Sequence, residues 1–150
     1  MNWPQAELTD VERLRALAAG VPGAAVTERV LAADPEQVKT MLADLNVFAA
    51  VQADFVSATI EERDGDRVVV RAKGARGQRA RLVGQLRPGW CWLQSRFVII
   101  GMAVAAEPGG GTRVALTGGI RVPGRARIVP IGVRRESTKT LDRLEQLLKA

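Results

Sequence analysis

The spacing of apolar and polar residues divides the chain into a helical beginning, a long series of strands and a helical end. In the first segment, residues 1–22, Val11, Leu14 and Ala18 recur at the spacing of one helix face. This spacing predicts an amphipathic helix that extends the chain ahead of its main domain, residues 23–150.

The main domain begins with a predicted strand over residues 24–33, where Val and Thr are frequent and alternate in part with polar residues. A helix is expected next, because Asp34 suits an N-cap and Pro35 suits the first helical position. A second short helical piece or turn is expected over residues 44–54.

Consecutive strands with turn residues between them follow, and the helical period then returns. The expected strands cover residues 56–62, 67–73, 78–87, 90–106 (two strands broken near Gly101) and 112–122. Residues 128–149 predict a long closing helix with Ser137, Leu141 and Leu144 on its apolar stripe. Strands in one run with the helices set apart indicate the α+β class, with the closing helix covering one face of an antiparallel sheet.

Alternation within the strands separates an apolar inward side from a charged outward side. Several inward positions hold Gly or Ala, which would leave volume beneath a single helix and so favour an apolar cavity. The inward residues read from this alternation are Val68, Val70, Ala72, Ala80, Leu82, Gly84, Leu86, Val114, Leu116, Gly118 and Ile120.

The apolar stretch over residues 90–100 allows two orientations, between which the sequence does not choose. In the first orientation the inward residues are Leu93, Ser95 and Phe97. In the second they are Trp90, Trp92, Gln94 and Arg96. An inward Arg96 could hold a ligand carboxylate or polarise a carbonyl, whereas an outward arginine is the commoner state.

Composition narrows the chemistry that this domain can perform. The 150 residues suit a single domain, and they include no histidine and no tyrosine. Ser–His and Cys–His pairs are therefore excluded, and the common zinc and iron ligand sets are missing, so we expect no metal and no cofactor. Cys91 is the only cysteine. It allows no disulfide within the chain, and a reducing cytoplasm is the expected compartment.

Charge is distributed unevenly along the chain. Of the 22 Lys and Arg residues, fourteen lie between residues 67 and 135, where Glu107 is the only acid. On the predicted strands these cations alternate with the inward residues, so they are expected on the outer face of the sheet with few acids nearby. This expected basic face includes Arg71, Arg79, Arg81, Arg113 and Arg121. The alternative is an ordinary solvated face in an arginine-rich protein.

Three segments give the chain a resemblance to a known superfamily. They are VLAADPEQVKTMLADL (30–45), EPGGGTRVAL (107–116) and ESTKTLDRLEQLLK (136–149). In this order they resemble the START-like superfamily (SRPBCC, Bet v 1-like), often described as polyketide cyclase/dehydrase and lipid transport. The resemblance implies a helix-grip fold, a curved sheet wrapped around the C-terminal helix. It also implies an apolar cavity between sheet and helix.

Three functions remain open at this stage. The first is binding of a small apolar molecule, lipid- or polyketide-like, by residues of the sheet and the closing helix. Those residues would be Leu82, Gly84, Leu86, Trp92, Leu93, Phe97, Val114, Leu116, Gly118, Ile120, Leu141 and Leu144.

The second function is a cyclase or aromatase that works without His, Tyr or metal. It would need two or more polar side chains converging in the cavity. The candidate catalytic residues are Gln94, Ser95, Arg96 and Ser137.

The third function is an interaction module that uses the basic face. Its partner would be an acidic carrier protein or an anionic surface. We do not expect nucleic acid, because aromatic residues make up only 4% of the chain and offer few stacking platforms.

Overall fold

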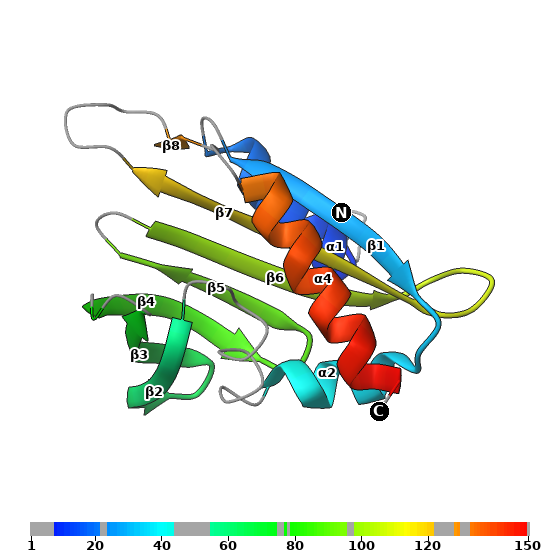
Figure 1. The fold of residues 1–150 in the computed structure, drawn as a ribbon, viewed down its shortest axis with the longest axis horizontal. Coiled ribbons are helices and arrows are strands. Elements are labelled where there is room, and N and C mark those ends of the chain that lie inside the picture. The colour runs from blue at the N-terminus through cyan, green and yellow to red at the C-terminus, as the bar shows by residue number, and fades with distance from the viewer. Residues whose placement is uncertain are drawn as a thin grey trace, which may run out of the picture.

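The computed structural model describes the backbone of residues 8–21, 24–43, 55–74, 77, 79–95, 98–121, 128–129 and 133–149. These residues form one antiparallel sheet with helices on both of its faces (Figure 1). The helices are α1 (Asp10–Ala19), α2 (Pro35–Ala43) and α4 (Val133–Lys149). The strands are β1 (Ala25–Leu31), β2 (Phe55–Asp64), β3 (Arg67–Gly74), β4 (Arg79–Arg87), β5 (Trp90–Gln94), β6 (Val98–Ala106), β7 (Thr112–Arg121) and β8 (Ile128–Val129).

Strand order explains how the sheet encloses the C-terminal helix. The order is β1-β7-β6-β5-β4-β3-β2, with β8 paired to β7. Each strand from β2 to β7 pairs with its neighbour in sequence, whereas β1 pairs with β7 at the far edge. The sheet curves, and α4 lies along its inner side (Figure 1). This arrangement is the predicted α+β helix-grip fold.

Helices α4 and α1 cover opposite faces of the sheet. Helix α4 contacts β1 and β7 on the inner face, where Leu141 and Leu144 are almost fully buried. Helix α1 contacts β6, β7 and β1, and its residues join a second apolar cluster with Trp90. The sheet therefore has an inner apolar layer beneath α4 and an outer apolar layer beneath α1.

Helix α1 has the features that its sequence pattern predicted. Val11, Leu14 and Ala18 are 0–3% exposed, which confirms the predicted buried stripe. At its start the Thr9 side chain accepts a hydrogen bond from the Glu12 backbone N–H, and the Glu12 carboxylate accepts one from the Thr9 backbone N–H. The helix begins at Asp10 because this capping box satisfies its first free N–H groups.

Helix α2 begins at Pro35, as expected, and the Asp34 carbonyl accepts its first helical hydrogen bond from Val38 at 3.1 Å. The second helical piece expected over residues 44–54 lies outside the described residues. In the part of the chain that is described, no helix is long and apolar enough to span a membrane.

Two predicted boundaries were wrong. The strands over 90–106 are separated after Gln94, and Gly101 lies inside β6. A Cβ at Gly101 would lie 2.9 Å from the Leu14 side chain and 2.6 Å from that of Thr117, so glycine is needed there for close approach. The closing helix α4 begins at Val133, and Ile128–Val129, which was expected to belong to it, pairs with β7 as strand β8.

Candidate functional site

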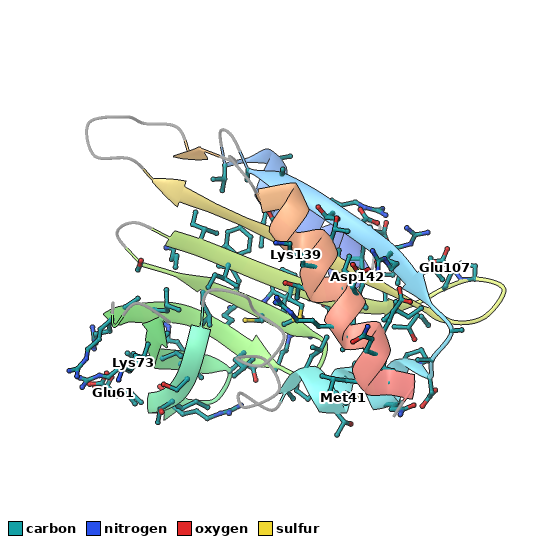
Figure 2. The ribbon with its side chains drawn as sticks, in the orientation of Figure 1. Met41, Glu61, Lys73, Glu107, Lys139 and Asp142 are labelled. Atoms are coloured by element: carbon teal, nitrogen blue, oxygen red, sulfur yellow. The ribbon has the colours of Figure 1, made fainter. Side chains whose placement is uncertain are left out.

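The inner face of the sheet brings together most of the residues predicted to bind an apolar ligand. They belong to one continuous cluster, and each of these predicted side chains is 0–4% exposed. The predicted residues in this cluster are Leu82, Leu86, Leu93, Val114, Leu116, Leu141 and Leu144. Val38 and Leu42 of α2 complete the cluster at one end, with the partly buried Met41 packed against it (Figure 2).

Strand β5 resolves the ambiguity over residues 90–100. Cys91 and Leu93 belong to the inner cluster, whereas Trp90 and Trp92 pack in the outer cluster beneath α1. Trp92 is therefore wrongly placed among the ligand-binding residues, and Gln94 is exposed rather than directed into the grip.

The outer face suits an indole ring because it offers polar partners. The Trp90 Nε1–H donates to Gln85 Oε1 at 3.1 Å, and the Arg87 guanidinium lies 5.6 Å from the ring centroid. Both contacts would be lost if β5 were turned over. They stabilise the orientation that the sequence left open.

The remaining predicted site residues are described only in part. Arg96 and Phe97 lie outside the described residues. The backbones of Gly118, Ile120 and Arg121 are in β7 and that of Ser137 is in α4, but their surroundings lie outside the description. Ser95 is half-buried just after β5. Of the four catalytic candidates, only Gln94 and Ser95 have described side chains, and the catalytic role of all four stays a prediction.

Gly84 was predicted to leave volume in the grip, and its neighbours give a different reason for it. A Cβ at this position would collide with the backbone carbonyl of Trp92 on the adjacent strand. The glycine therefore permits close approach of β4 and β5 rather than opening a cavity.

A row of small side chains crosses the inner face elsewhere. Ala58, Ala72 and Ala80 are in register on β2, β3 and β4. The next inward row holds the larger side chains of Ile60, Val70 and Leu82. The alanine row lies at the end of β4 remote from the β4–β5 turn, whose Gly89 is next to Lys39 of α2. The smallest inward side chains of β2 to β4 are therefore concentrated at one end of these strands.

The inner layer carries little polar chemistry. Burial raises the pKa of the Cys91 thiol to about 12, so the thiol is protonated near neutral pH. The Thr112 hydroxyl donates to the backbone carbonyl of Ala33 at 2.6 Å. Across the described ranges, no three His, Cys, Asp or Glu residues gather as a metal site. The described inner cluster is an apolar, uncharged environment.

Acidic residues interrupt the basic outer face that the sequence predicted. Arg113 binds Glu107 at 2.8 Å and Glu28 at 3.2 Å, and Arg87 binds Asp10 of α1 at 2.7 Å. The expectation of few nearby acids was wrong for these positions, because β1, α1 and the β6–β7 turn supply carboxylates. Arg71, Arg79 and Arg81 lie together on β3 and β4, away from this network.

Comparison with known proteins identifies the fold. Neither a family model nor a curated protein matches the chain. Among solved structures, the KanY protein (ms6282) has a TM-score of 0.64 and 16% identity, covering 86% of this chain and 99% of its own. A START superfamily protein from Mycobacterium smegmatis has a TM-score of 0.55 and 16% identity, with coverages of 84% and 97%. Ara h 8.0201 has a TM-score of 0.56 and 14% identity, with coverages of 83% and 96%. The chain therefore has a START-like, Bet v 1-like fold.

Proposed function

We propose that this protein binds a small apolar molecule between helix α4 and the inner face of strands β3 to β5. The inner cluster joins sheet residues such as Leu82 and Leu93 to Leu141 and Leu144 of the helix. An apolar ligand is favoured there because a charged ligand would lose its hydration without gaining a partner.

The observation that carries this proposal is the row formed by Ala58, Ala72 and Ala80. Helix α4 contacts β1 and β7, whereas the alanine row lies across β2, β3 and β4. Because these small side chains lie on strands other than β1 and β7, they favour a ligand at the end of the inner face remote from α2. The START-like fold supports this interpretation, since its members commonly bind hydrophobic ligands between sheet and helix.

The first test is to identify what the protein carries. Native mass spectrometry of the purified protein, followed by organic extraction, should reveal a co-purified apolar compound. Titration with a neutral solvatochromic dye such as Nile red should give saturable binding with a blue-shifted emission. A protein that carries no compound and binds no dye would contradict the proposal.

A pair of matched substitutions tests where the ligand lies. Ala72→Leu adds volume on the inner face, and Ala103→Leu adds the same volume beneath α1, where Ala103 is 0% exposed. If the alanine row lines a ligand space, Ala72→Leu should abolish dye binding and change the free energy of unfolding by less than about 0.5 kcal/mol. Ala103→Leu should cost about 1–3 kcal/mol through overpacking and leave dye binding intact in the folded fraction. Comparable destabilisation by both variants would mean that the inner row is closely packed, and would overturn the proposed site.

A further inference from the structure

The outer face of strands β3 and β4 carries four cations in two directly opposed pairs. Arg71 pairs with Arg81, and Lys73 pairs with Arg79, in the antiparallel register. All four side chains are exposed. We call these four residues the β3–β4 cation patch. Like charges directly opposite each other destabilise a sheet, so the sheet gains no stability from this arrangement.

A carboxylate already occupies one of the two pairs. Glu61 of β2 lies 3.4 Å from the Arg71 guanidinium through one oxygen and 3.8 Å from that of Arg81 through the other. The first pair therefore binds a carboxylate that bridges its two cations. This bridge is a structural precedent for the kind of anion that the patch accepts.

Among the described residues, no carboxylate bridges the second pair, Lys73 and Arg79. Among the described residues, Lys73 and Arg79 have no ion-pair partner, and the β2 residue in register with Lys73 is Ser57. Ser57 is exposed and uncharged, so it leaves both cations available. Figure 2 shows Lys73 and Glu61 at the β2–β4 end of the molecule, opposite the end that holds Glu107. Helix α1 covers β6, β7 and β1 and leaves this part of the outer face open.

We propose that the β3–β4 cation patch docks a carboxylate-rich segment of a partner protein, with one carboxylate bridging Lys73 and Arg79 as Glu61 bridges Arg71 and Arg81. Charge complementarity and the Glu61 precedent favour carboxylates over phosphates. The described outer face of β2 to β4 carries no aromatic side chain on which a nucleic-acid base could stack. Among the described side chains of this face, Val83, 42% exposed, is the one large apolar side chain that is strongly exposed, which is little for insertion into a lipid surface. This docking surface is separate from the proposed ligand site and does not depend on it.

The test uses a fluorescently labelled oligoglutamate peptide and measures its affinity by anisotropy. Lys73→Gln combined with Arg79→Gln should weaken binding by about tenfold, because the unoccupied pair is removed. Arg13→Gln combined with Lys139→Gln removes the same charge from exposed positions on α1 and α4 and should change affinity by less than about twofold. Wild-type affinity should fall by about tenfold between about 50 mM and about 200 mM salt.

A single substitution with the opposite expected sign makes the test sharper. Glu61→Gln removes the internal carboxylate and frees Arg71 and Arg81, so affinity for oligoglutamate should rise by about two- to fivefold. If the peptide were attracted only by the net positive charge of the protein, the patch variant and the control variant would lose the same amount of affinity. Thermal melts of each variant show that the fold is retained, and the patch variant should melt no lower than wild type because an opposed like-charge pair has been removed.

Three results would overturn the proposal. They are unchanged oligoglutamate binding by the patch variant, a Glu61→Gln affinity no higher than that of wild type, and tighter binding of a phosphate polyanion. The last comparison uses double-stranded DNA of equal charge and phosphatidylserine-containing vesicles, measured with the same variants. If either binds more tightly than the peptide and depends on Lys73 and Arg79, the partner is a nucleic acid or a membrane instead.

Discussion

At the scale of single residues, the two faces of β5 place neighbouring side chains in different environments, and this difference sets the pKa of Cys91. Cys91 points into the inner layer and is 2% exposed, whereas its neighbours Trp90 and Trp92 lie beneath α1. Burial disfavours the thiolate and raises the pKa of the Cys91 thiol from 9.0 to about 12. The only cysteine of the chain is therefore a neutral apolar group in the folded protein.

The raised pKa of Cys91 predicts a pH dependence of stability. Below pH 9.0 the thiol is protonated in both the folded and the unfolded states, so its contribution is fully present. Above that pH the unfolded chain ionises first, so the free energy of unfolding should fall as the pH rises from 9.0 toward about 12. Urea unfolding at a series of alkaline pH values should show a steeper loss in wild type than in Cys91→Ala. Equal slopes for the two proteins would contradict the proposed burial of the thiol.

At the scale of elements, α1 is an integral outer layer of the sheet. Leu14 is 0% exposed and packs where Gly101 of β6 removes a side chain. The helix is joined to the sheet by ion pairs of Asp10, its first residue, with Arg87 and of Arg15, near its middle, with Glu28. Apolar packing and ion pairs together place α1 over β6 and β7.

Two leucines on α1 provide a matched test of this docking. Leu14→Ala removes a fully buried side chain and should lower the free energy of unfolding by about 2–5 kcal/mol. Leu17→Ala on the same helix removes a side chain that is 45% exposed and should change it by less than about 0.5 kcal/mol. Urea denaturation followed by tryptophan fluorescence measures both, since Trp90 and Trp92 lie beneath the helix. Similar values for the two variants would show that α1 does not pack as described.

At the scale of the whole molecule, folding brings the acidic first part of the chain onto the basic strands. Glu28 of β1 accepts hydrogen bonds from Arg15 of α1 and from Arg113 of β7. On the inner side, Arg29 binds Asp142 at 2.7 Å and Glu145 at 2.9 Å on α4. Ion pairs therefore link edge strand β1 to helix α1 on the outer side of the sheet and to helix α4 on the inner side.

This network predicts acid sensitivity. The hydrogen bond from Arg15, with Arg113 in support, lowers the pKa of Glu28 below its ordinary value of 4.5. A lowered folded-state pKa stabilises the protein above pH 4.5, and this contribution is lost as the pH falls through the folded-state value. Glu28→Gln should reduce the free energy of unfolding by about 1–2 kcal/mol at neutral pH. The difference between wild type and variant should shrink in acid, as measured by urea unfolding at each pH. A difference independent of pH would contradict this role of the carboxylate.

Local pattern was sufficient to predict most elements and the class of the fold. The capping sequence before α1, Pro35 at the start of α2 and the alternation along β3, β4 and β7 each depend on residues close in sequence. Such signals predicted the buried stripe of α1 and the inward Leu82, Leu86, Val114 and Leu116. A helix places every third or fourth side chain on one face, and a strand places every second. The START-like resemblance of the motifs agrees with the observed strand order.

Tertiary structure alone decided what depends on neighbours distant in sequence. The orientation of β5 depends on the outer cluster, in which Trp90 and Trp92 pack with residues of α1, and Gly84 and Gly101 owe their identity to groups on other strands and on α1. The predicted basic face contains ion pairs because carboxylates from β1, α1 and β2 lie next to arginines that are distant in sequence. The cation patch is the part of this face where cations remain opposed to each other. A single sequence records the period of each element but not which elements approach each other, and contact between them is what sets burial, pairing of charge and available volume.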